Sequence, residues 1–95
     1  MHRDKIEYFK GNLIQHGEHN DRLYLMRFFP LQAESLPCDL INFADKNEYS
    51  KIFTKVPEHA AKCFYSAGFI EEALIPGFFS GKEPAAFMSF YLNPD

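Results

Sequence analysis

The sequence has few cysteines, no tryptophan and no excess of basic residues. Two cysteines, Cys38 and Cys63, are too few for a disulfide framework or a four-cysteine zinc site. We therefore expect two reduced, buried thiols in a cytoplasmic protein. The 10 Lys and Arg residues are outnumbered by 13 Asp and Glu residues, which gives a formal charge of −3. This balance argues against nucleic-acid binding and against a polybasic membrane-binding surface.

Long apolar runs and paired glycines are absent as well. No apolar run approaches the roughly 20 residues of a membrane helix, and no basic stretch followed by an apolar segment suggests a secretory signal. The five glycines are isolated, and no Gly-x-Gly pair is present. A loop that cradles phosphates needs glycines where its backbone approaches the ligand closely, so a phosphate-binding loop is not expected.

Aromatic residues are abundant. The 95 residues include 11 Phe and 5 Tyr, and 46% of the chain is hydrophobic. A chain of this length forms one small domain over residues 1–95, and large rings suit a small core because each buries much area. Some of these rings could instead contact a partner. Composition alone therefore predicts a globular domain and no particular function.

The first half of the chain predicts strands around one helix. Residues 5–9 and 12–16 are short runs that form either a hairpin or a frayed leader, and a turn follows at 17–21. The nearly continuous apolar run 22–28 predicts a central strand ended by Pro30. The runs 12–16 and 22–28 should pair antiparallel. Leu36, Leu40, Phe43 and Ala44 form one apolar face of a helix over residues 35–46, with Ser35 as N-cap and Asn47 in the left-handed conformation at its end.

The second half predicts a crossover and a hairpin. Residues 50–56 predict a strand parallel to 22–28, and residues 57–67 a second helix with Gly68 just past its end. A Schellman-type ending would bring Phe64 against Phe69. Runs 70–79 and 85–92 form a hairpin across a turn at 81–84. The order β(β)β-α-β-α-ββ predicts an α/β fold, a mixed sheet with two helices.

Two sets of residues could carry chemistry, and each also has an ordinary structural interpretation. His16, Glu18 and His19 could face a metal ion, but no third converging ligand is evident and a solvated turn is favoured. Cys63 lies near the end of a helix, where the dipole does not stabilise a thiolate, so burial is favoured over catalysis. No metal site is therefore expected.

Residues 75–79 combine a Pro-Gly pair with two phenylalanines, Phe78 and Phe79. A bulged strand that packs its rings inward is the favoured interpretation, and a pocket or dimer surface is the alternative.

Several separated blocks resemble the β-lysine N-acetyltransferase family. They span most of the chain between residues 12 and 91: Leu13–Gly17, Asn20–Met26, Lys51–Pro57, Gly68–Ala73, Ile75–Gly81 and Phe87-Met88. Such enzymes are similar to the GCN5-related acetyltransferases and use acetyl-CoA to acetylate the side-chain amine of β-lysine, whose product is a compatible solute that accumulates under osmotic stress. The resemblance implies that this chain is the N-terminal portion of a longer acetyltransferase, whose catalytic domain would follow.

The matched region resembles a degenerate half of a GCN5-related acetyltransferase. The last-helix motif of that superfamily, Ala-x-x-x-Tyr-x-x-x-Gly-Phe, falls on residues 60–69 with Phe64 at the position of the general-acid tyrosine. Tyr65 is one residue further, rotated by about 100° around a helix. The superfamily's pyrophosphate loop, Gln/Arg-x-x-Gly-x-Gly/Ala, corresponds to residues 28–35, which contain no glycine and include Pro30 and Glu34.

The resemblance and the two losses predict a non-catalytic domain with no catalytic and no cofactor-binding residues of its own. Acetyl-CoA would be bound by the parent enzyme, and the partner would be a C-terminal acetyltransferase domain or a second subunit, with no nucleic acid and no membrane. Tyr65, Phe78 and Phe79 are the candidates for substrate or interface contact. Two alternatives are a free-standing interaction module that forms a homodimer through exposed aromatics or a sheet edge, and a small acetyltransferase that uses Tyr65.

Overall fold

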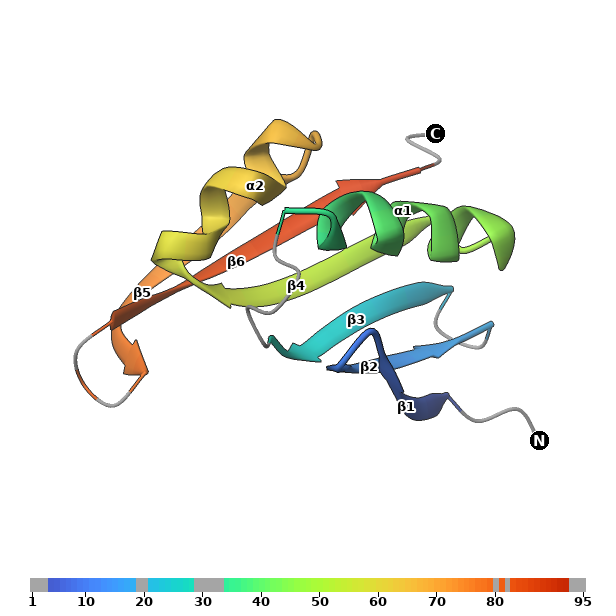
Figure 1. The fold of residues 1–95 in the computed structure, drawn as a ribbon, viewed down its shortest axis with the longest axis horizontal. Coiled ribbons are helices and arrows are strands. Elements are labelled where there is room, and N and C mark those ends of the chain that lie inside the picture. The colour runs from blue at the N-terminus through green and yellow to red at the C-terminus, as the bar shows by residue number, and fades with distance from the viewer. Residues whose placement is uncertain (1–3, 19–20, 29–33, 80, 82, 93–95) are drawn as a thin grey trace.

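A computed structural model describes residues 4–18, 21–28, 34–79, 81 and 83–92. One six-stranded mixed sheet and two α-helices make up this part of the chain, as the sequence predicts (Figure 1). The elements are β1 (Lys5–Phe9), β2 (Asn12–Gly17), β3 (Arg22–Arg27), α1 (Leu36–Lys46), β4 (Lys51–Pro57), the 3₁₀ turn η2 (Glu58–Ala60), α2 (Ala61–Ser66), β5 (Ile70–Phe79) and β6 (Glu83–Tyr91).

The strand order in the sheet is β1-β2-β3-β4-β6-β5. β1, β2 and β3 pair antiparallel in sequence, and β3 then pairs in parallel with β4 across the α1 crossover. β6 lies between β4 and β5 and pairs antiparallel with both. The predicted antiparallel pair, the parallel crossover and the final hairpin are all confirmed. β3 is a central strand, which explains its nearly continuous apolar sequence.

Both helices pack on the same face of the sheet and form a single core with it (Figure 1). On α1, Leu36, Leu40 and Ala44 are buried at helical spacing. On β3 and β4, buried residues alternate with partly exposed ones, because successive side chains of a strand point to opposite faces. Neither helix within the described ranges has the length and apolar character of a segment that crosses a bilayer.

The prediction for the end of α1 is wrong by one residue. Asn47 has φ −92°, and Glu48, with φ 61°, is the residue in the left-handed conformation. The Glu48 N–H donates to the Asp45 carbonyl at 3.1 Å, and the Tyr49 N–H donates to the Ala44 carbonyl at 2.9 Å. This is a Schellman ending with Glu48 in the place that glycine usually takes. Ser35 precedes the helix as predicted, but its side chain makes no capping hydrogen bond.

The second predicted helix is shorter than expected at its start. Pro57 has ψ 147° and still pairs with Ala85 as the last residue of β4, so η2 and α2 begin only after it. The predicted ending is confirmed. The Gly68 N–H donates to the Tyr65 carbonyl at 3.0 Å, the Phe69 N–H donates to the Phe64 carbonyl at 3.0 Å, and the two phenyl rings meet edge to face.

β5 and β6 form a long hairpin with a shorter turn than predicted. Glu83 and Pro84 belong to β6 rather than to the turn. The register of β5 against β6 shifts twice, between Glu71 and Ala73 and between Ile75 and Phe79, so the predicted bulge at residues 75–79 is present. Gly77 has φ 65° within the second irregularity, a conformation that glycine adopts without strain.

Candidate functional site

The parallel strands β3 and β4 separate towards their carboxyl ends. They pair from Arg22 opposite Lys51 to Leu25 opposite Thr54, and the described residues beyond that point do not continue the pairing. A cavity of about 290 Å³ lies beyond it, lined by Met26, Arg27, Phe28, Lys55 and Pro57. In open α/β sheets, ligands bind in crevices outside the carboxyl ends of parallel strands. We refer to this cavity as the β3–β4 cleft.

Phe64, on α2, belongs to the core beside the β3–β4 cleft. Its side chain is completely buried, with ring centroids 6.1 Å from Phe28 and 5.2 Å from Phe69. Phe28 also lines the cleft, so the ring of Phe28 lies between Phe64 and the cleft. A phenyl ring has no exchangeable proton, and Phe64 therefore has no acid-base chemistry to offer there.

Tyr65, the nearest hydroxyl on the same helix, is on the surface. Its ring is 49% exposed, and its hydroxyl donates a hydrogen bond to Glu71 Oε1 at 2.8 Å. That hydrogen bond to the carboxylate stabilises the protonated phenol and raises the pKa of Tyr65. The arrangement ties α2 to β5 and leaves the hydroxyl engaged away from the core.

The loop expected to hold a diphosphate falls largely outside the described residues. Residues 29–33 are not described, and Phe28, Glu34 and Ser35 are its described part. Arg27 and Lys55 are the cations that line the cleft.

Phe78 does not pack inward. It is 43% exposed and lies against Phe87, with ring centroids 6.2 Å apart, while the Lys55 ammonium is 5.0 Å from its ring centroid. The preference for inward packing is therefore wrong for Phe78, because the bulge in β5 turns this part of the strand. Phe79 ends β5 opposite Glu83, and its side chain lies outside the described residues.

The two thiols differ from each other. Cys38 is exposed on α1, so the prediction that both are buried is wrong for this residue. Cys63 is partly buried and its Sγ donates to the Ala60 carbonyl at 3.1 Å. Burial raises the pKa of the Cys63 thiol, which keeps it protonated and poorly nucleophilic.

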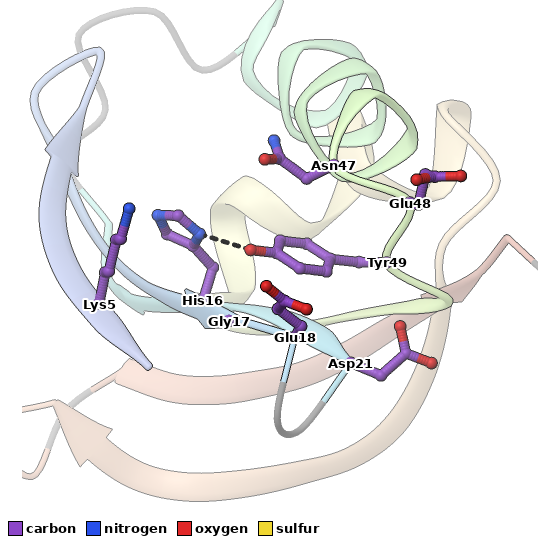
Figure 2. Close-up of a pocket in the computed structure, with 8 residues that line it drawn as sticks. All are labelled: Lys5, His16, Gly17, Glu18, Asp21, Asn47, Glu48 and Tyr49. Atoms are coloured by element: carbon purple, nitrogen blue, oxygen red, sulfur yellow. Dashed lines mark hydrogen bonds between the residues drawn. The ribbon is translucent and has the colours of Figure 1, made fainter. Parts of the chain in front are cut away.

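A second and larger cavity, of about 480 Å³, opens at the opposite end of β3 (Figure 2). It is lined by Lys5, His16, Gly17, Glu18, Asp21, Asn47, Glu48 and Tyr49. The interpretation of His16 as part of a solvated turn is wrong, since this residue is only 6% exposed. No group of His, Cys, Asp or Glu in the described part of the chain is placed to hold a metal ion, and His19 lies outside that part.

His16 joins three segments through its ring nitrogens. Nδ1 lies 2.8 Å from the Tyr49 hydroxyl, and Nε2 contacts the Glu7 carboxylate. An ionised carboxylate only accepts hydrogen bonds, so Nε2 carries the proton that faces Glu7. In the neutral imidazole Nδ1 then accepts from the Tyr49 hydroxyl, and in the imidazolium it donates to the hydroxyl oxygen. The alternation of β2, which places His16 on the same face as Asn12 and Ile14, was the signal that could have indicated its burial.

Tyr49 should make stability depend on alkaline pH. Burial is the main cause that raises its pKa from 10.0, and the nearby Asp4, Glu18 and Glu7 act in the same direction. The folded state therefore holds the phenol proton more tightly than the unfolded state. This contribution is complete below about pH 10 and is lost as the pH rises through the folded pKa.

We expect the free energy of unfolding to fall more steeply as the pH rises above about 10 in the wild type than in Tyr49→Phe. At pH 8 the substitution should cost about 1 kcal/mol, for the lost hydrogen bond to His16. Urea denaturation across this pH range measures both effects. Tyr8→Phe is the control, because it removes a phenol that is exposed on β1. Identical pH slopes in the wild type and Tyr49→Phe would contradict the assignment.

No protein-family model matches the sequence, and no curated protein matches it at a significant level. The solved structures whose fold matches include two acetyltransferases. The ribosomal-protein-S18-alanine N-acetyltransferase from Escherichia coli aligns with 99% of this chain and 71% of its own chain, with a TM-score of 0.63 and 16% identity. Nourseothricin acetyltransferase aligns with 84% of this chain and 55% of its own, with a TM-score of 0.56 and 17% identity. The chain therefore has an acetyltransferase-like fold of the GCN5-related type.

Proposed function

We propose that this chain is the non-catalytic, N-terminal domain of a β-lysine N-acetyltransferase. Its task is to pack against a C-terminal acetyltransferase domain or a second subunit and so to shape the site that receives the amine. The acetyltransferase-like fold supports the superfamily, and the resemblance of the sequence blocks supports the finer assignment. The observation that carries the non-catalytic part is Phe64.

Phe64 occupies the last-helix position at which the superfamily motif has a tyrosine. It is fully buried between Phe28 and Phe69. A hydroxyl introduced there would need a hydrogen-bond partner inside an aromatic cluster. Tyr65 does not replace it, since its hydroxyl is committed to Glu71 on the surface. The role of Phe64 at this position is therefore to pack in the core.

The β3–β4 cleft fits coenzyme A poorly. At about 290 Å³ it falls at the lower limit of small-molecule sites, which span roughly 300–1,000 Å³. Arg27 and Lys55 supply positive charge, but the segment 28–35 lacks glycine and contains Glu34 and Pro30. A proline has no N–H to donate, and a carboxylate opposes a diphosphate. The residues present thus favour a domain that binds no acyl donor.

Isothermal calorimetry of the 95-residue chain with acetyl-CoA tests the proposal. We expect no heat beyond dilution up to millimolar ligand, because the sequence of residues 28–35 has no glycine and its Pro30 supplies no N–H. Free coenzyme A serves as the second titrant, since it carries the same diphosphate without the acetyl group. Micromolar affinity that is lost in Lys55→Glu, a change at the cleft, would overturn the non-catalytic assignment.

A second candidate function is a free-standing protein-interaction module that forms a dimer. The observation that favours it is the apolar face of the sheet that neither helix covers. Sedimentation of the chain separates the two: a dimer whose population does not change with dilution supports the module, and a monomer supports the domain that awaits a partner.

A further inference from the structure

Most of the large apolar side chains on the protein surface lie on one side of the sheet. Eight large apolar residues are exposed in the described part of the chain. The strand register places five of them opposite the helices, and a sixth, Phe78, lies there against Phe87. We call this side the open face. Its exposed apolar members are Ile6, Tyr8, Ile70, Ile75, Phe78 and Tyr91.

The strand register fixes which residues belong to the open face. On β4, Ile52 and Thr54 are buried towards the helices, so Phe53 between them points the other way. Tyr24 and Ser89 flank Phe53 on the neighbouring strands and share its orientation. The aromatic residues therefore continue across the centre of the sheet rather than lying only at its margin.

A groove of about 350 Å³ runs over this centre. Its lining is mostly apolar and aromatic, and it comprises Arg22, Tyr24, Phe53, Thr54, Glu72, Phe87 and Met88. Sheets in α/β folds bury both of their apolar faces against other elements. A groove among partly exposed aromatic rings therefore indicates a binding surface for another helix or strand.

The charges on the open face are mostly positive, although the protein as a whole carries −3. Arg22 and Lys51 face each other across β3 and β4, and Lys55 lies further along β4 against Phe78. In the described part of the chain, the buried Nε of Arg22 has no hydrogen-bond partner. The one carboxylate in the groove, Glu72, already accepts a hydrogen bond from Ser89 at 2.9 Å.

We propose that the open face is the docking surface for an acidic amphipathic helix from another segment of polypeptide. Its apolar stripe would cover Tyr24, Phe53 and Phe87, and its flanking carboxylates would meet the cations. The inference rests on the proposed function for the existence of a partner. It adds the face on which that partner docks and the chemistry by which it is recognised.

Charge complementarity selects this occupant over a second copy of the chain. In a two-fold dimer through the open face, the surface that carries Arg22, Lys51 and Lys55 would meet the same positively charged surface of the copy. Like charges brought together in an interface are costly, whereas carboxylates facing these cations steer association and fix register. A helix is the element that covers the opposite face of this same sheet, and helices pack on both faces in α/β folds.

The test uses two synthetic peptides of 20 residues with the same leucine stripe, one flanked by glutamates and the other by lysines. Fluorescence anisotropy measures binding of each labelled peptide to the full 95-residue chain at low salt. We expect the glutamate peptide to bind at least tenfold more tightly, and its advantage to shrink as salt screens the charges.

Charge-reversal variants locate the binding surface. Lys51→Glu with Lys55→Glu should remove or invert the preference for the glutamate peptide. Lys46→Glu with Lys62→Glu is the matched control, because it changes the net charge equally at exposed positions on the two helices. Circular dichroism of each variant before titration confirms that it is folded. The control pair should keep at least three-quarters of the wild-type preference, expressed as the logarithm of the affinity ratio.

Three results would overturn the inference. They are equal affinity for both peptides, the same loss of preference in both double variants, and a sedimentation profile of a stable dimer that excludes either peptide. The last result would assign the face to a second copy. Binding of acetyl-CoA would contradict the proposed function without altering the outcome of the peptide test, so the two failures are distinguishable.

Discussion

Replacing Phe64 by alanine should lower the free energy of unfolding by about 3–5 kcal/mol, the usual range for a buried phenylalanine. The side chain is completely buried, and its ring meets Phe28 and Phe69 edge to face. Its removal leaves a cavity between α2 and the sheet that the surrounding side chains refill only in part. Urea denaturation followed by circular dichroism measures the loss.

Tyr65→Ala is the matched control for this experiment. It removes the neighbouring ring of the same helix, which is 49% exposed and bonded to Glu71 at the surface. We expect this substitution to cost less than about 1 kcal/mol. A larger loss from Tyr65→Ala than from Phe64→Ala would show that the exposed ring, not the buried one, holds α2 in place.

Gly68→Ala should lower the free energy of unfolding by about 2–4 kcal/mol, from backbone strain together with overpacking. Gly68 has φ +105°, and a Cβ built there would lie 3.1 Å from Cε2 of Phe90. The ring of Phe90 packs against Phe69, with centroids 5.3 Å apart, so it has little freedom to move. The same denaturation measurement applies.

Gly11→Ala separates the two causes of that loss. Gly11 also has a positive φ, +83°, but no atom lies within 4 Å of the added Cβ. Its substitution should cost only the backbone strain, about 1–2 kcal/mol. Equal losses at the two positions would mean that Phe90 yields and that contact contributes nothing.

Local sequence patterns predicted most of the fold because the same residues that set the secondary structure also form the core and the helix ends. The apolar run of β3 is central in the sheet, and the interval between Phe64 and Gly68 sets the end of α2. Pro57 was the least decisive of these signals. A proline is tolerated both in the first turn of a helix and at the end of a strand, so the sequence alone did not distinguish the two. In the structure Pro57 pairs with Ala85 and is the last residue of β4.

The candidate site was less predictable, since its residues come together only through long-range packing. His16 is buried because Tyr49, 33 residues away, closes over it. Phe78 is exposed because two register shifts in β5 change the direction of its side chain. Glu48 adopts a positive φ because the backbone must turn before Tyr49 enters the core, and Asn47 instead bonds its side-chain amide to the Phe43 carbonyl.

The two outermost strands also restrict how the protein can aggregate. β5 contains Pro76, which has no N–H, and Gly77, which has a positive φ. The outer edge of β5 therefore cannot present a continuous row of hydrogen-bonding groups to an added strand. β1 is only five residues long and carries Lys5 and Glu7. Both edges of the sheet therefore disfavour the addition of a strand from another molecule, which is the step that leads to fibrils and domain swapping. A destabilised variant should form amorphous precipitate rather than ordered fibres.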